Sequence, residues 1–202
     1  QALQPGAEQA EADAWGTLLA GQLIVENVPQ VSARDVEKKQ RVVSHLVGIL
    51  EQGHLPAVER AAAGVALAHL GDLRPGVRVK ADGTPDIVWC EIPAGPFLMG
   101  SSDEGTMAFN SEKPQHTFVI PMPYYISRYP VTQAQYAAFV KADGYAERRY
   151  WTEAGWQRKE REDWAGPECY GAPFDLPNHP VVGVSWYEAV AFCRWLGEQL
   201  KA

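Results

Sequence analysis

The stretch NHPVVGVSWYEAVAFCRWL, residues 178–196, decides the fold of the second part of this chain. Ser185 is followed three residues later by Glu188, which is the capping-box spacing, in which two side chains pair with the free amide groups at a helix start. Thr132 and Gln135 repeat this spacing within YYISRYPVTQAQYAAFV, residues 124–140. The two motifs therefore predict helices that begin after residues 132 and 185.

Short β-type runs lie upstream of these motifs. They occupy residues 87–92, 97–99, 117–120 and 124–126, where β-branched and aromatic residues are bounded by Gly, Pro or polar residues. Residues 143–180 follow no regular period and are rich in Trp, Tyr, Gly, Pro and charge. A stretch with so many aromatic residues is expected to be packed irregular structure rather than disordered chain.

Four blocks of sequence together resemble the formylglycine-generating enzyme, or sulfatase-modifying factor, family. They are IPAGPFLMGSS (92–102), EKPQHTFVI (112–120) and the two stretches quoted above, and the resemblance covers about residues 86–200. It implies an α+β fold of the C-type lectin-like kind, here incomplete, with much irregular structure. The chain is also similar to the variable proteins of diversity-generating retroelements, which use the same branch of this fold for binding.

The first part of the chain has a different composition, because every aromatic residue except Trp15 lies after residue 80. Residues 1–75 are expected to form a helical segment that is typical of the end of a helical array, and residues 76–85 a linker. Residues 86–202 are then the N-terminal part of the family domain.

Three helices are expected in the helical segment. One covers residues 7–25. A second covers residues 35–52, with Ser32 as its N-cap and Gly53 as its C-cap, and a third runs from Pro56 towards residue 71.

The charge balance excludes a nucleic-acid partner, because the formal net charge is -7 and nucleic acids are held by clustered positive charge. No apolar run approaches the roughly 20 residues of a membrane span. The odd number of cysteines, with no zinc-site spacing, predicts a reducing, cytoplasmic compartment. Cys193 is expected on the apolar face of its helix, and Cys169, in the polar loop, is expected to be the reactive thiol.

The resemblance also implies where cofactors bind. Active members bind copper through two cysteines near the end of the domain, where calcium sites also lie, and no residue of this chain matches those cysteines. Related iron enzymes take histidine ligands from a preceding helical domain, but His45, His54 and His69 are not spaced as a ligand set. We therefore expect no cofactor in this chain and copper or calcium in the C-terminal remainder of the domain, which is its expected partner.

The aromatic-rich residues 145–170 supply the candidate ligand-binding residues, and a protein is one expected ligand. Large aromatic side chains offer contact area with few rotamers to freeze, and arginines offer polar anchors. An alternative stays open, in which the same side chains form an irregular core. The candidates are Tyr150, Trp151, Trp156, Arg158, Trp164 and Tyr170.

Two short motifs carry groups that suit acid–base or metal chemistry. They are Glu112 with His116, and Asn178 with His179. In both motifs the favoured alternative is structural, with hydrogen bonds that hold a turn or a loop-to-strand junction. We expect no catalytic and no metal-binding residue in this chain.

Two functions remain. The favoured one is a ligand- or protein-binding module with a formylglycine-generating-enzyme-like fold, within a larger bacterial multidomain regulatory protein and not catalytic in this fragment. The alternative is a copper oxidase of the sulfatase-maturation type, or a related non-haem iron enzyme, whose catalytic residues lie beyond Ala202.

Overall fold

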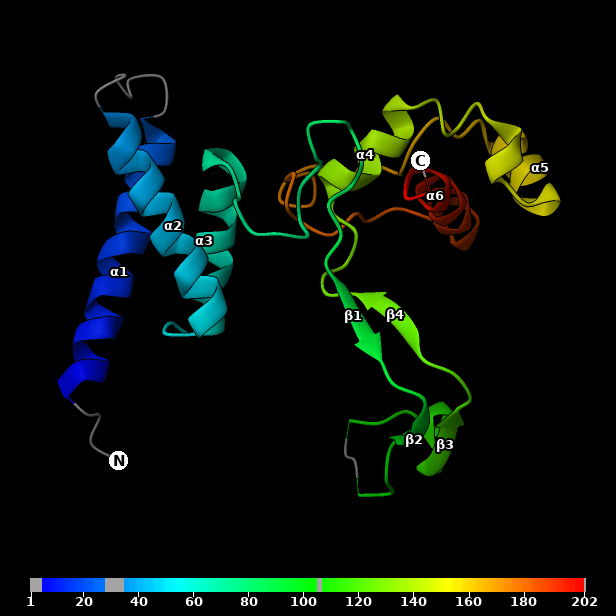
Figure 1. The fold of residues 1–202 in the computed structure, drawn as a ribbon, viewed down its shortest axis with the longest axis horizontal. Coiled ribbons are helices and arrows are strands. Elements are labelled where there is room, and N and C mark those ends of the chain that lie inside the picture. The colour runs from blue at the N-terminus through cyan, green and yellow to red at the C-terminus, as the bar shows by residue number, and fades with distance from the viewer. Residues whose placement is uncertain (1–4, 28–34, 105–106, 202) are drawn as a thin grey trace. The chain divides into compact units, whose positions relative to one another are not determined.

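The computed structural model describes residues 5–27, 35–104 and 107–201. They form two compact units, Gln1–Ile87 with Tyr129–Ala202, and Val88–Arg128. The six α-helices described belong to the first unit and the four β-strands to the second (Figure 1). None of the helices in these ranges is both long enough and apolar enough to cross a bilayer.

Three helices open the first unit: α1 Pro5–Glu26, α2 Val36–Gln52 and α3 Ala57–Leu70. They confirm the three helices expected from the sequence pattern. Gly53 caps the end of α2 with a left-handed φ of 70°, a conformation that favours glycine. Ser32, the expected N-cap of α2, lies outside the described residues.

Small residues let the three helices pack closely. A Cβ atom built on Gly21 of α1 would lie 2.9 Å from Cδ1 of Leu46 in α2, so a larger residue there would displace the buried Leu46 side chain. In α3, Ala63 and Ala66 are buried against the same core. The larger buried side chains of this core are Leu18, Val43, Leu46, Ile49, Leu55, Leu67 and Leu70.

Two further helices of the first unit, α4 Gln133–Lys141 and α6 Trp186–Gln199, begin as expected. Both capping boxes are present, one at Thr132 and one at Ser185. The helix starts are therefore confirmed by the side-chain geometry that the sequence spacing predicts.

The expectation that residues 143–180 lack regular structure was wrong at α5 Glu153–Glu162. Thr152 caps this helix by accepting a hydrogen bond from the amide of Gly155 at 3.0 Å. The sequence EAGWQRKERE is charged on most sides, so no apolar stripe revealed the helix. A short 3₁₀ helix, Arg148–Tyr150, precedes it.

Aromatic rings make the core between α4, α6 and the segment that follows α4. Phe139 is fully buried at its centre. Five rings lie with centroids 5.6 to 6.2 Å from that of Phe139, the range in which edge-to-face pairs are favourable. They belong to Tyr136, Tyr145, Tyr150, Phe192 and Trp195.

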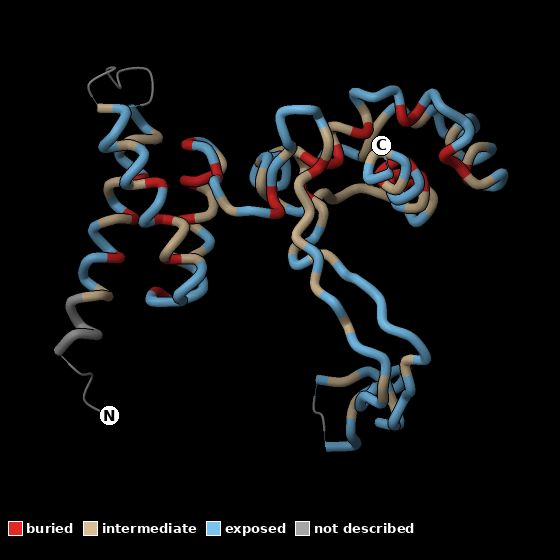
Figure 2. Tube along the Cα trace, viewed as in Figure 1, coloured by how far each residue is buried: buried red, intermediate tan, exposed pale blue. Residues whose placement is uncertain are grey.

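The second unit consists of two antiparallel two-stranded ladders. In one, β1 Trp89–Ile92 pairs with β4 Tyr124–Ser127, and in the other β2 Gly95–Met99 pairs with β3 His116–Ile120. The four expected β-runs are thus confirmed. Figure 2 shows these strands in exposed and intermediate colours, and no residue of the four strands is buried.

Candidate functional site

A hollow of about 670 Å³ opens in the first unit between the end of α5, the loop that follows it and the start of α6. The lining of this α5–α6 hollow comes from residues 158, 162–166, 168 and 170, from residues 183–185 and from Glu188. The charged and aromatic side chains of this lining are Arg158, Glu162, Asp163, Trp164, Glu168, Tyr170 and Glu188.

Backbone geometry shapes the wall of the hollow. Asp163 ends α5 in the left-handed conformation, with φ 51°. Farther along, the amide of Glu168 donates to the carbonyl of Gly183 at 2.9 Å. A Cβ on Gly183 would lie 2.2 Å from the carbonyl oxygen of Glu168. Only glycine therefore allows these two segments to meet, since this position also has a φ of 71°.

Carboxylates dominate the charge of the hollow. Four of them, on Glu162, Asp163, Glu168 and Glu188, line it against the single guanidinium of Arg158. The Arg158 Nε donates to Glu162 at 3.1 Å. The carboxylates outnumber the guanidinium, so the hollow has a net negative charge. Two of the carboxylates, those of Asp163 and Glu168, are exposed.

Two aromatic side chains complete the lining. The guanidinium carbon of Arg158 lies 5.6 Å from the ring centroid of Trp164, within the range of a cation–π contact. The hydroxyl of Tyr170 donates to Glu168 at 2.9 Å. This hydrogen bond, together with the charge of Glu168, raises the pKa of Tyr170. Aromatic surface and carboxylates thus line one hollow.

The base of the hollow is tied to the aromatic core through Glu188, which is 2% exposed. One oxygen of this carboxylate accepts from the Tyr145 hydroxyl and the other from the amide of Ser185. The hydroxyls of Tyr136 and Tyr145 lie 3.1 Å apart. Burial, first of all, raises the pKa of both tyrosines well above the ordinary value, so they serve as neutral hydrogen-bonding groups.

The six candidate ligand-binding residues fall into two groups. Arg158, Trp164 and Tyr170 line the hollow together. Tyr150 and Trp151 are 3% and 5% exposed and belong to the aromatic core. This burial favours the core alternative for those two residues. The ligand-binding role of all six stays a prediction.

Trp156, the sixth candidate, is half-buried beside the core. Its ring centroid lies 6.4 Å from that of Trp151, and the ammonium group of Lys159 lies 4.9 Å from the same Trp156 ring. Trp156 does not line the hollow. Its contacts are therefore those of a packing residue at the edge of the core.

Sequence reasoning missed the carboxylates of the hollow. Glu188 was recognised as part of a capping box, but not as a member of a site. Glu162, Asp163 and Glu168 carried no motif, and only the end of an unforeseen helix brings them together. The charged run of residues 158–163 followed by Trp-Ala-Gly, residues 164–166, is the one signal in the sequence that could have indicated this place.

Residues 78–201 match the sulfatase-modifying factor enzyme 1-like domain family. The chain belongs to this family. It is 38% identical to a formylglycine-generating enzyme of Thermomonospora curvata, over 54% of this chain and 44% of the relative. It is 34% identical to a hercynine oxygenase of Mycolicibacterium thermoresistibile, over 52% of this chain and 26% of the relative. The chain thus spans less than half the length of these curated relatives.

The described residues of the sulfatase-modifying factor domain form no cluster that fits a metal centre. In the part of the chain that the structure describes, no group of three or more His, Cys, Asp and Glu side chains is placed to hold a metal ion. Cys90, Cys169 and Cys193 are each free. The donor set of a copper or iron centre is therefore not assembled by the described residues.

One cysteine prediction was wrong. Cys193 is exposed on α6 rather than turned into the apolar face. The helix presents Phe192, Trp195 and Leu196 to the core instead. Partial burial of its thiol still raises the pKa of Cys193. Cys169 is exposed, and its expected reactivity stays a prediction.

The Glu112 and His116 side chains hold a turn in the second unit. Glu112 accepts from the Ser101 hydroxyl at 2.8 Å. His116 Nδ1 lies 3.0 Å from the carbonyl of Pro114 and donates to it, because a carbonyl can only accept. Both bonds are local, as expected if Glu112 and His116 hold a turn rather than act as an acid–base pair.

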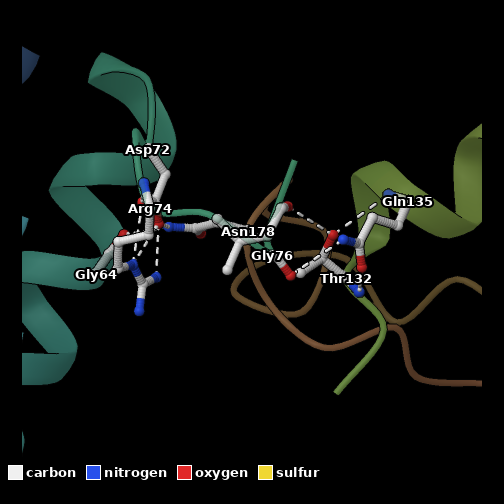
Figure 3. Close-up of polar contacts among 8 residues, drawn as sticks. Gly64, Asp72, Arg74, Gly76, Thr132, Gln135 and Asn178 are labelled. Atoms are coloured by element: carbon white, nitrogen blue, oxygen red, sulfur yellow. Dashed lines mark hydrogen bonds and ion pairs between the residues drawn. The ribbon is translucent and has the colours of Figure 1, made fainter. Parts of the chain in front are cut away.

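Asn178 holds the sulfatase-modifying factor domain to α3, as Figure 3 shows. Its amide nitrogen donates to the carbonyl of Gly64 at 3.0 Å and to the carboxylate of Asp72 at 2.9 Å. Arg74 forms an ion pair with the same carboxylate at 2.6 Å. Asn178 therefore has the structural role that the sequence favoured.

Residues 76–85, the expected linker, are bonded to the start of α4 (Figure 3). The side-chain nitrogen of Gln135 donates to the carbonyls of Gly76 and Asp86, at 3.1 and 2.7 Å. The hydroxyl of Thr132 donates to the carbonyl of Val77 at 3.0 Å. The capping residues of α4 thus also anchor the incoming chain, and the exact domain boundary stays a prediction.

Proposed function

We propose that this chain is a binding module that uses a formylglycine-generating-enzyme-like domain of the C-type lectin-like kind to recognise a protein ligand. The observation that carries the proposal is the α5–α6 hollow, where Arg158, Trp164 and Tyr170 meet a set of carboxylates. We place the module in a cytoplasmic bacterial regulatory protein of several domains. The helical segment α1–α3, which lies before the family match, supports that context.

The chemistry of the hollow favours a cationic side chain as the recognised group. A guanidinium or ammonium is attracted both by carboxylates and by the faces of Trp and Tyr rings. Arg158 already has Glu162 as its ion-pair partner. The exposed carboxylates of Asp163 and Glu168 are the groups that an incoming cation would meet.

The test is a titration of the ¹⁵N-labelled chain with N-acetyl-arginine amide, followed by amide chemical shifts. We expect saturable shifts at Gly166, Glu168 and Gly183. Asp163→Asn combined with Glu168→Gln should weaken binding at least about fivefold, which corresponds to the loss of about 1 kcal/mol. Asn tolerates the left-handed conformation of position 163, so the fold is retained.

Glu160→Gln is the matched control, because this exposed α5 carboxylate does not line the hollow. It should bind as the unmodified chain does. N-acetyl-glutamine amide should give no saturable shifts. Equal shifts with both probes, or unchanged binding in the double variant, would contradict the proposal.

A second function is favoured by the named relatives, a formylglycine-generating enzyme and a hercynine oxygenase. In it, the chain is part of an oxidoreductase whose copper, iron or calcium is held outside these residues. The chain by itself is then expected to bind neither copper nor iron at one equivalent. Stoichiometric binding that is lost in His116→Ala or His179→Ala would assign a metal site to this chain instead.

A further inference from the structure

The β2–β3 ladder of the second unit carries an unusual set of side chains. Neither strand contains a charged residue: they read GPFLM and HTFVI. Strands at the edge of a sheet ordinarily carry charge or proline, which blocks association. β2 carries one proline, Pro96, whereas β3 carries none. The large apolar side chains are nevertheless exposed, at 43% to 63%, on Phe97, Leu98, Met99, Phe118 and Val119.

Both faces of the ladder are apolar. Phe97 lies opposite Phe118, with ring centroids 5.9 Å apart, and this pair forms one face. Leu98 and Val119 are one residue farther along each strand, so they point to the other face. A two-stranded ladder is marginally stable by itself in water. Burial of the exposed apolar side chains on both faces, by another segment of protein, would therefore stabilise the ladder.

One edge of the ladder is open to a further strand. In the described part of the chain, β3 pairs with β2 and with no other strand. β2 contains Pro96, which lacks an N–H donor, whereas β3 contains no proline. The outer edge of β3 therefore keeps its full set of donors and acceptors for strand addition.

We propose that the β3 edge is a docking site for an extended apolar segment, supplied by the portion of a sulfatase-modifying factor domain that this chain does not span. The Thermomonospora curvata relative carries more than half of its length outside the match. Such a length of chain can add a strand to β3 and cover both faces.

The experiment uses overlapping peptides of about 12 residues, long enough for one strand, that cover the unmatched portion of the Thermomonospora curvata relative. Each peptide is added to the full chain, and hydrogen exchange of the β3 amides is measured. At least one peptide with alternating apolar residues should slow exchange at Thr117–Val119 about tenfold or more. Short peptides avoid the need for the unmatched portion to fold by itself.

Two variants keep the result interpretable. Val119→Lys changes the exposed face of β3 and should weaken peptide binding about tenfold or more. Val58→Lys, at a 77% exposed position of α3, is the control and should bind normally. Protection of β3 that appears with rising concentration of the chain alone would identify a second copy as the occupant. No protection by any peptide, or protection that Val119→Lys leaves intact, would overturn the proposal.

Discussion

The Tyr145 hydroxyl donates a hydrogen bond of 2.5 Å to the carboxylate of Glu188, across 43 residues of sequence. The other carboxylate oxygen of Glu188 accepts from the amide of Ser185 at 2.6 Å. One side chain thus caps α6 and fixes the segment after α4. Because Tyr145 and Glu188 are both buried, neither finds a water partner when the other is removed.

The first prediction is that Tyr145→Phe lowers the free energy of unfolding by about 1–3 kcal/mol, the cost of a buried acceptor without a partner. Urea unfolding, followed by far-UV circular dichroism, measures this. Glu188→Gln should cost less than Glu188→Ala, because a glutamine amide retains partners for both groups. Equal unfolding midpoints for Tyr145→Phe and the unmodified chain would show that the bond contributes nothing to stability.

This pair also marks what the sequence predicts and what it does not. The spacing of Ser185 and Glu188 identifies a local cap, because both groups belong to one helix turn. The Tyr145 partner comes from another part of the chain, and no local pattern encodes it. Strands were predicted because their residue pattern is also local. The carboxylates of the hollow were not predicted, because the end of α5 and the start of α6, which are separate segments of the sequence, bring them together.

A second prediction concerns the tight contact between Gly144 and Phe139. A Cβ on Gly144 would lie 2.0 Å from a ring carbon of Phe139, and that ring is fixed by its neighbours in the aromatic core. Gly144→Ala should therefore destabilise the chain by about 1–3 kcal/mol through overpacking. Thermal unfolding measures the change.

Gly197→Ala is the matched control for this glycine. It lies in α6 with nothing within 4 Å of an added Cβ, and alanine favours helix by up to about 1 kcal/mol over glycine. The two substitutions should shift the melting temperature in opposite directions. A rise for both would mean that the segment around Gly144 relaxes at little cost.

The third prediction concerns pH and the Asp72 carboxylate. Burial opposes its ionisation, but hydrogen bonds from Arg74 and Asn178 outweigh burial and hold the pKa of Asp72 below the ordinary 3.8. A carboxylate whose pKa is lower in the folded state than in the unfolded state stabilises the fold at pH values above the unfolded-state pKa. This contribution to stability is lost as the pH falls through the folded-state pKa. The chain should therefore lose stability below about pH 3.8.

Urea unfolding at several pH values between 2 and 6 measures this loss. Asp72→Asn should be less stable at pH 6 and should show a smaller decline towards pH 2. Asp175→Asn, at an exposed position, is the control and should follow the unmodified chain. A decline of the same size in Asp72→Asn would assign the acid sensitivity to other carboxylates.

The last prediction separates core from surface among the candidate aromatic residues. Trp151 is 5% exposed, and its indole nitrogen donates to the carbonyl of Gly144 at 2.9 Å. Trp151→Ala should therefore cost about 3–5 kcal/mol of stability. Tyr170 is 57% exposed at the hollow, so Tyr170→Ala should leave the melting temperature nearly unchanged and weaken binding of N-acetyl-arginine amide. A large stability loss in Tyr170→Ala would make this ring a packing residue, and unchanged binding would remove it from the recognition surface.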